Sequence, residues 1–559
     1  MTAAAHVGPD PAAPRRRAAL AVRTGLAGTS ELTRLAFRRD RIALPAGVYV
    51  ITALVAGTAY TFRRLYPTPA ARAALAAAGG TNPALRFLYG RLDGDSLGSL
   101  TTWRYGIWAG IFAALMTVFI VIRHTRTDEE AGRLELVGSA AVGRQAALAA
   151  ALLTAAVPSV AVAGLLCLVL PLVHLPAAGS AALALSIGCC GLAFAGIAAV
   201  AAQLSASARA ARGIALGALG VAFVLRGVGD SDPHTGAAGP SWLSWASPLA
   251  WIQLVRPFAS ARWWVLAFPL AIFAAGTALA FGLAARRDLD AGLLPDRPGR
   301  ATASAFLHGP FGLAWRLQRG ALLGWAVGYA FTFAATGAAA KGVGQLLGTS
   351  SALEREIARL GGGQAAITNA YLSAIMLLAG LVAAAYAVSV ILRLRTEETQ
   401  DRAEPVLATA TSRVRWALSH VAVAVAGAAL LLAVAGVAAG LGYGLRAGSA
   451  GSQVARMLGA AMGQLPSALA LAAVAVLVFG VLPRACVASA WTAVGLVVVL
   501  FLFGQVLKLS HWVLDISPFT HAPRLPGGTV SAAPLLWLCL AALAFSAAGL
   551  AGLRRRDIG

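Results

Sequence analysis

The chain has 559 residues, of which 59% are hydrophobic and 12% are charged, and its mean hydropathy is +0.75. Soluble domains carry about 25% charged residues, so this composition excludes an ordinary soluble globular protein. The formal net charge of +23 could suit a nucleic-acid-binding protein. However, the arginines stand mostly in short loops between apolar runs, where they orient membrane helices and contact anionic lipid. No nucleic-acid partner is therefore expected.

Apolar segments long enough to span a membrane recur along the whole chain. Residues 1–28 precede them and contain basic residues but no sustained apolar run, which predicts a disordered cytosolic tail and not a cleavable signal peptide. The twelve predicted spans are residues 43–62, 105–122, 145–172, 179–204, 211–228, 263–285, 320–340, 370–392, 416–443, 465–482, 485–507 and 534–553. The sequence therefore predicts an all-α integral membrane protein with twelve transmembrane helices.

The twelve spans divide into two halves of six. The polar stretch 286–310 carries Pro and Gly and predicts a cytosolic linker between a first half, 29–285, and a second half, 311–559. An even number of spans places both termini on one side, and both termini are basic, which predicts that this side is the cytoplasm. Arg63 and Arg64 depart from this rule, because they fall in the first outside loop.

A charged segment occurs twice in the chain, 269 positions apart. RTDEEAGRLELVGSAAVGR begins at Arg126, and RTEETQDRAEPVLATATSR begins at Arg395. Two further pairs of motifs keep the same order relative to the predicted spans: LAFRRDR and LAWRLQR before the first span of each half, and SPLAWIQLVRPF and SPFTHAPRLP before the last. This internal repeat predicts two tandem six-helix units of the same orientation, which form a pseudo-dimer with its axis along the membrane normal.

The charged segment has the pattern of a short amphipathic helix at the cytoplasmic surface. Thr127 stands where a helix cap is needed, and Glu130 three residues later completes a capping box. Glu129 precedes Arg133 by four residues, as Glu398 precedes Arg402, which is the favoured order for a helical ion pair. A solvated loop is the alternative. The two copies of the charged segment keep their charges at the same positions, while the spans of the two halves have diverged in sequence. This contrast favours a docking role for the charged segment.

These segments and the outer SWLSWASPLAWIQLVRPF and ISPFTHAPRLP stretches resemble permeases of the ABC-2 type, the transmembrane components of ATP-binding-cassette exporters. More narrowly, the chain is similar to the long, fused permeases of actinobacterial exporters of polyketide antibiotics, from about Leu35 to Arg556. The resemblance implies ABCG-like halves whose charged segments are coupling helices that seat in a separate ATPase subunit. It also implies interfacial connecting helices at LAFRRDR and LAWRLQR, and short re-entrant helices at the outer stretches. The coupling residues that it implies are Thr127, Asp128, Glu129, Glu130, Arg133, Glu135, Thr396, Glu397, Glu398, Arg402 and Glu404.

The resemblance further implies a transport path between the halves, lined by the second and fifth helix of each. Apolar and adaptable side chains on these helices would suit hydrophobic, drug-like cargo. The path residues expected on this basis are Phe112, Met116, Phe119, Phe223, Met376, Phe501 and Phe503. The second outer stretch has Phe519 and His521 where the first has Leu249 and Trp251, so we expect the two outer gates to differ.

The sequence is not expected to encode an enzyme. A P-loop ends in Gly-Lys-Ser/Thr, and neither Lys341 in AAAKGVG nor Lys508 in QVLKLS fits that pattern. An ABC exporter would then need two copies of a separate ATPase subunit, which would hold ATP and Mg. The five cysteines lie in apolar segments without metal-ligand spacing, so no metal, cofactor or catalytic residue is expected in this chain.

The sequence therefore favours the permease subunit of an ATP-driven exporter in the cell membrane, which extrudes hydrophobic antibiotics or drugs by alternating access. The alternative is a proton-coupled secondary multidrug transporter, which would need membrane-embedded carboxylates, and none stands in the middle of a predicted span. A membrane enzyme is a third class. Its candidate acids and bases, which also suit solvated turns, are Asp93, Asp95, Asp230, Asp232 and His234.

Overall fold

Every regular element in the described part of this computed structural model is a helix. The model describes residues 25–81, 83–138, 142–231, 241–287, 291–293, 301–302, 307, 309–347, 364–503, 510–529 and 531–556. Within these ranges, eleven helices are long and apolar enough to cross a membrane, and a shorter apolar helix covers Cys486–Phe501. The chain is therefore a multi-pass membrane protein. The shorter helix coincides with the predicted span 485–507, part of which lies outside the described residues.

The chain divides into two compact units, Met1–Pro298 and Gly299–Gly559. The division falls inside the predicted linker 286–310, while the limits 29–285 and 311–559 stay predictions. Most of the predicted tail, residues 1–24, lies outside the described residues, as do Asp232 and His234.

Unit 1 contains the first six spans and several shorter helices at their two ends. Its helices are α2 (Thr29–Arg39), α3 (Ala43–Leu65), α4 (Pro69–Thr81), α5 (Pro83–Tyr89), α6 (Leu97–Thr101), α7 (Ile107–Ile122), α8 (Asp128–Glu130), α9 (Arg133–Gly138), α10 (Ala146–Leu172), α11 (Ala177–Leu204), α12 (Ala208–Ser231), α13 (Trp242–Trp245), α14 (Trp251–Leu254) and α15 (Ala267–Ala284). Two π-helical turns, Thr102–Gly106 and Arg123–Thr127, join α6, α7 and α8 into one span.

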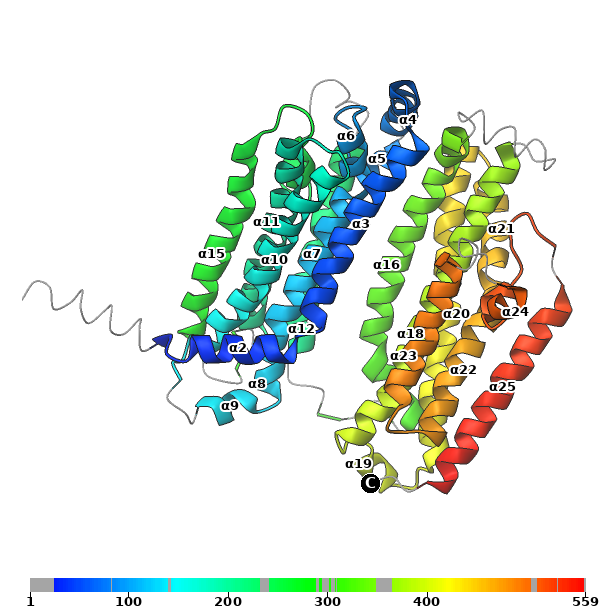
Figure 1. The fold of residues 1–559 in the computed structure, drawn as a ribbon. Coiled ribbons are helices and arrows are strands. Elements are labelled where there is room, and N and C mark those ends of the chain that lie inside the picture. The colour runs from blue at the N-terminus through cyan, green and yellow to red at the C-terminus, as the bar shows by residue number, and fades with distance from the viewer. Residues whose placement is uncertain are drawn as a thin grey trace, which may run out of the picture. The chain divides into compact units, whose positions relative to one another are not determined.

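The two ends of unit 1 carry different structures. The amphipathic α2 lies across one end, close to α8 and α9, as LAFRRDR predicts, while α4, α5 and α6 gather at the other end (Figure 1). We call the end with α2, α8 and α9 the charged end, and use the same term for the end of unit 2 that carries the second charged segment. The small helices α4 and α5 have no counterpart in the sequence prediction, because an 18-residue hydropathy criterion does not detect such short helices.

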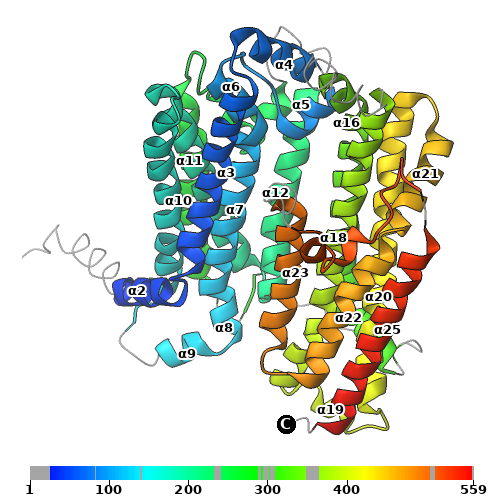
Figure 2. The ribbon, with the colours of Figure 1, turned by 45° about the vertical axis from the view of Figure 1, so that its right-hand side comes forward.

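Unit 2 contains the remaining spans. Its helices are α16 (Pro310–Leu347), α18 (Gln364–Thr399), α19 (Glu404–Leu407), α20 (Arg413–Ala447), α21 (Ala450–Met462), α22 (Leu465–Val481), α23 (Cys486–Phe503), α24 (His511–Leu514) and α25 (Ala532–Arg555). Figure 2 shows α19 at one end of this unit, beside the C-terminal end of α25. The expected connecting helix at LAWRLQR is not separate, because these residues form the first turns of the 38-residue α16. The outer stretch of unit 1 contains the expected short helices α13 and α14, whereas that of unit 2 contains a single 3-10 turn, Pro518–Thr520, and α24 ends just before it.

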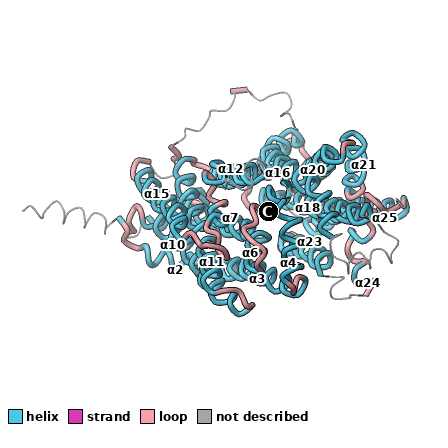
Figure 3. Tube along the Cα trace, turned by 90° about the horizontal axis from the view of Figure 1, so that it is seen from above, coloured by secondary structure: helices cyan, strands magenta, loops and turns pink. Residues whose placement is uncertain are grey.

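Small residues hold the spans of each unit close together. In unit 1, α11 is the most deeply buried span, and it packs against α7, α10 and α15 (Figure 3). Gly196 of α11 and Gly276 of α15 face each other so closely that a Cβ atom on Gly276 would lie 2.8 Å from the carbonyl carbon of Gly196. In unit 2, a Cβ atom on Gly480 of α22 would overlap the carbonyl oxygen of Gly549 of α25. Both units therefore pack their fourth and sixth spans through glycine contacts.

Replacing Gly276 with alanine is expected to destabilise the protein by about 1–3 kcal/mol, because the added methyl group forces two backbones apart. Gly282 on the same helix has nothing within 4 Å of the Cβ position, so Gly282→Ala is the matched control. The melting temperature of detergent-solubilised protein measures both. Equal melting temperatures for the two variants would contradict the close packing of α11 against α15.

Candidate functional site

The first charged segment begins inside a span and not at the start of a separate helix. The span Leu97–Glu130 continues through the π-helical turn, and the chain breaks only at Gly132, whose φ is +66°. Thr127 has helical φ and ψ and makes no capping hydrogen bond. The predicted helix cap at Thr127 is therefore wrong, since that residue lies within a continuous helix.

Long-range contacts replace the predicted capping box. Thr127 Oγ1 accepts a hydrogen bond from Arg212 at 2.8 Å, and Glu130 Oε1 accepts one from the backbone N–H of Ala208 at 2.7 Å. Both partners belong to the start of α12. Glu130 thus serves the first turn of a different helix, whose free N–H groups favour a carboxylate.

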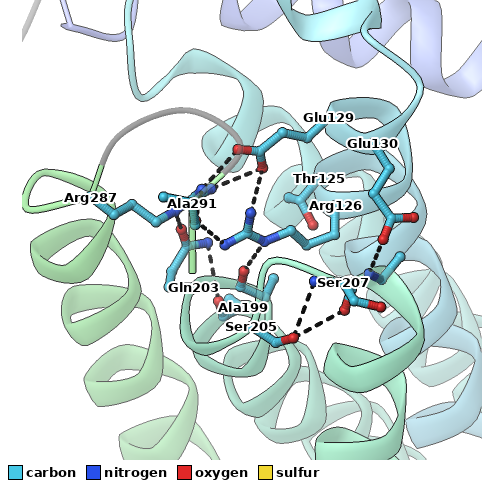
Figure 4. A network of polar contacts seen from close by, with 12 residues as sticks. Thr125, Arg126, Glu129, Glu130, Ala199, Gln203, Ser205, Ser207, Arg287 and Ala291 are labelled. Atoms are coloured by element: carbon cyan, nitrogen blue, oxygen red, sulfur yellow. Dashed lines mark hydrogen bonds and ion pairs between the residues drawn. The ribbon is translucent and has the colours of Figure 1, made fainter. Parts of the chain in front are cut away.

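Glu129 lies buried between two arginines at the charged end of unit 1 (Figure 4). Arg287 donates from Nη1 and Nη2 to its two carboxylate oxygens, at 2.8 and 3.0 Å. Arg126 Nη1 lies 3.2 Å from Glu129 Oε2. The predicted pair with Arg133 is therefore wrong, because the Glu129 carboxylate is taken by Arg126 and Arg287, and only 4% of the Glu129 side chain is exposed.

The two arginines around Glu129 are themselves anchored. Arg287 Nε donates to Gln203 Oε1 at 2.7 Å. Arg126 donates to the carbonyl oxygens of Ala202 and Ala291, the second at 2.9 Å. These contacts occupy Nε of both arginines and Nη2 of Arg126, so each buried charge is held by hydrogen bonds as well as by Glu129.

Asp128 joins three segments at the charged end of unit 1. Arg39 of α2 donates to both of its carboxylate oxygens, at 2.7 and 3.1 Å. Arg133 of α9 donates to Oδ1 at 2.6 Å. His124 Nδ1 lies 3.8 Å away, and its Nε2 lies 2.7 Å from Asp40 Oδ2. Asp128 thus links α2, α9 and the end of the second span.

The second charged segment repeats part of this arrangement. Glu398 contacts Arg395 Nη1 at 3.0 Å and Arg556 Nη2 at 3.0 and 3.1 Å. The predicted Glu398–Arg402 pair is therefore wrong, since Glu398 lies between Arg395 and Arg556. Glu397 lies 3.2 Å from Arg393 Nε and 3.3 Å from His420 Nε2.

Burial divides the expected coupling residues into two groups. Asp128, Glu129 and Glu397 are buried, and the Glu398 side chain is 8% exposed. Ion pairs within the chain use these four acids, and their expected coupling role stays a prediction. The members that stay exposed are Glu130, Arg133, Glu135, Thr396, Arg402 and Glu404.

The expected path residues do not share one environment. Phe112 and Phe119 of α7 are exposed, at 37% and 48%, whereas Met376 of α18 is fully buried in the core of unit 2. Met116, Phe223 and Phe501 are half-buried, and the side chain of Phe503 lies outside the described part of the chain. Phe112 and Phe119 can meet cargo or lipid in this conformation, and Met376 cannot.

The candidate acids of the opposite end differ from the predicted solvated turn residues. Asp230 belongs to the last turn of α12 and is buried, with Arg226 Nη1 3.6 Å from its Oδ2 and Ser244 Oγ donating to its Oδ1 at 2.8 Å. Asp93 lies 3.7 Å from Arg256 Nε, and burial raises the pKa of its carboxyl group, opposed by Arg256. Asp95 is exposed.

A metal site is not indicated in the described ranges, where no group of three or more His, Cys, Asp and Glu side chains could hold an ion. The chemistry at the charged ends is instead that of carboxylates shared between arginines.

Arg287 and Arg556 are the residues of these clusters that sequence reasoning missed. Both stand 158 positions after the glutamate that they bind. A signal was present, because RRD follows the last span of each half at the same distance from the charged segment.

Comparison with known proteins gives concordant matches. A family model described as the C-terminal domain of the multidrug efflux system permease Rv1217c matches residues 307–554. Over 537 residues the chain is 43% identical to the multidrug efflux system permease protein Rv1217c of Mycobacterium tuberculosis (strain ATCC 25618 / H37Rv), a match that covers 96% of each chain. The similarity thus extends over both units.

Proposed function

The chain belongs to the family of ABC-type multidrug efflux permeases, and from this premise we propose that it is the permease subunit of an ATP-driven exporter. Two copies of a separate ATPase subunit would bind ATP and Mg and dock on the charged ends of the two units. Closure of the ATPases would shift the spans of each unit and open the path outward, and hydrolysis would reset it. The cargo would be hydrophobic, drug-like molecules, and both termini would be cytoplasmic.

The duplicated charged end is the observation that supports this proposal. Each unit carries a short helix, α9 or α19, directly after a long span, and exposed polar residues lie on or beside it. Exposed polar residues held at one end of a rigid scaffold are typical of a docking surface. One such surface in each unit suits a pair of identical ATPase subunits.

A proton-coupled transporter is the alternative, and Asp230 is the buried carboxylate that it could use. Arg226 and Ser244 both contact that carboxylate. A proton carrier must release and regain its proton during transport, whereas Asp230 is held by fixed contacts within unit 1. The contacts of Asp230 therefore favour a structural role.

The test is transport of the dye Hoechst 33342 in inverted membrane vesicles that contain the full chain and its co-expressed ATPase. We expect dye transport that requires ATP, stops with vanadate and survives a proton uncoupler. Transport driven by a proton gradient without ATP would instead support the secondary transporter.

Glu135 and Glu404 allow a direct test of docking, because they are exposed and hold equivalent positions in the two charged segments. The double variant Glu135→Lys/Glu404→Lys is expected to lower dye export roughly tenfold or more and to lose the co-purifying ATPase, since like-charge contacts across an interface cost several kcal/mol. Its melting temperature should not change. The matched control is Asp95→Lys at the opposite end of unit 1. Normal export by the double variant would rule out docking through these residues.

A further inference from the structure

Four residues of unit 1 recur in unit 2 as the same residue types at the same spacing. Arg126, Glu129, Arg144 and Arg287 correspond to Arg395, Glu398, Arg413 and Arg556. The first three of each set belong to the charged segment, and the fourth follows the last span of the unit. We call each set of four a clamp.

The contacts within the two clamps follow the same plan, although Arg287 meets Glu129 through both Nη1 and Nη2 and Arg556 meets Glu398 through Nη2. In each, the glutamate lies between an arginine three residues before it and an arginine 158 residues after it. The segment's closing arginine donates to the backbone carbonyl oxygen of that distant arginine, 143 residues away: Arg144 to Arg287 at 2.5 Å, and Arg413 to Arg556 at 2.6 Å. Long-range contacts that recur in both units of the repeat are not expected of solvated loops.

The surroundings of the clamps differ between the units, although the plan of the clamps does not. Arg287 donates to Gln203 of α11, whereas the guanidinium of Arg556 lies 4.7 Å from the centre of the Phe479 ring of α22. An amide oxygen and an aromatic face both stabilise a buried arginine. The parts held constant are the shared carboxylate and the bound carbonyl group, which points to the clamp itself as the functional element.

Each clamp ties three spans together at the charged end. The glutamate lies at the end of the second span, the closing arginine at the start of the third, and the distant arginine just after the sixth. Hydrogen bonds between arginine and carboxylate are directional and short-ranged, and separating such a buried pair is unfavourable. A displacement of the second span is therefore passed to the end of the sixth.

We infer that Arg287 and Arg556 are positioning residues, which make the sixth span of each unit follow the segment that meets the ATPase. The inference rests on the proposed function, because the clamp needs a docked ATPase to move it. The buried glutamates would then pass the movement of the docked ATPase on to the sixth span, whereas the exposed Glu135 and Glu404 would make the docking contact.

The test compares single substitutions with an exchange of charges in the full chain with its ATPase. Arg287→Glu and Glu129→Arg should each lower dye export at least about tenfold, because each leaves like charges together in a buried site. The exchange variant Glu129→Arg/Arg287→Glu should recover part of the export and of the melting temperature relative to Glu129→Arg, because the pair between positions 129 and 287 is restored while Arg126 still lies beside position 129. Arg286→Gln and Arg555→Gln are the matched controls, since these neighbouring arginines are exposed and should export normally.

The amount of dye exported per ATP hydrolysed reports on coupling between the ATPase and the spans, and the melting temperature reports on folding. Arg287→Lys keeps the charge but loses the fork, so it should remain folded and hydrolyse ATP while exporting less dye for each ATP consumed. An exchange variant as inactive and as unstable as the single variants would overturn the clamp, and so would unchanged ATP consumption per dye molecule in Arg287→Lys. If the wild-type chain showed no ATP-driven export, the proposed function would fail, while the recovered melting temperature of the exchange variant would still report on the pairing.

Discussion

Replacing Arg226 with methionine is expected to lower the free energy of unfolding by about 3–5 kcal/mol, because it leaves the Asp230 carboxylate buried without its counter-ion. Arg226 is fully buried, donates from Nη2 to the carbonyl oxygen of Phe87 at 2.5 Å, and lies 4.7 Å from the centre of the Phe223 ring. The substitution therefore removes contacts that hold α5 against α12 as well as the ion pair.

The double variant Arg226→Met/Asp230→Asn should be more stable than Arg226→Met alone. Asparagine removes the unpaired charge and can still accept the hydrogen bond from Ser244, and buried ion pairs are often replaced by uncharged groups at little cost. The two substitutions are thus strongly non-additive. Melting temperatures of the single and double variants in detergent measure this, and a double variant less stable than Arg226→Met would contradict the ion pair.

Hydropathy predicted the spans because it depends only on local composition. All twelve predicted segments coincide with apolar helices, although α23 is shorter than the other spans in the described ranges. The same method ended the fifth span at residue 228 and excluded Asp230 from it. In the structure α12 continues to Ser231, because Arg226 and Asp230 stand one turn apart and neutralise each other, which a hydropathy average cannot register.

The charged segment shows where local rules mislead. Thr127 and Glu130 have the spacing of a capping box, but the structure pairs them with α12, through Arg212 and the backbone of Ala208. Tertiary contacts of this kind are separated by about 80 residues and have no local signature. The repeat itself marked the segments that contain Glu129 and Glu398, the centres of the two clamps. It did not indicate that both would be buried.

The two units also differ at the residue before each clamp glutamate. Asp128 contacts Arg39, Arg133 and His124, whereas Glu397 contacts Arg393 and His420. One partner of Asp128, Arg39, belongs to the separate helix α2, whereas the residues that correspond to α2 in unit 2 belong to the continuous α16. Unit 1 therefore uses the Asp128 carboxylate, beside the contacts of Asp40 with Arg123 and His124, to attach a helix that unit 2 carries as part of a span.

The variant Asp128→Ala is accordingly expected to release α2 and α9 from the end of the second span. The cost should stay below that of breaking a fully buried pair, about 3–5 kcal/mol, because the Arg39 and Arg133 side chains are 30% and 53% exposed and water can solvate them, but the Arg39 fork and the Arg133 hydrogen bond are both lost. Trypsin should then cleave membranes containing the variant faster at the arginines of α2, and ATP-driven dye export should fall sharply. Glu135→Ala on the exposed side of α9 is the control for protease access.

The comparison with Glu397→Ala decides what Asp128 does. If Asp128 attaches α2, its loss should expose α2 to trypsin, whereas loss of Glu397 should leave the protease pattern of α16 unchanged, because covalent helix continuity holds that segment in place. Equal protease patterns for wild type and Asp128→Ala would show that the apolar face of α2 is sufficient to hold it. In that case the fork between Arg39 and Asp128 would orient α2 and would not anchor it.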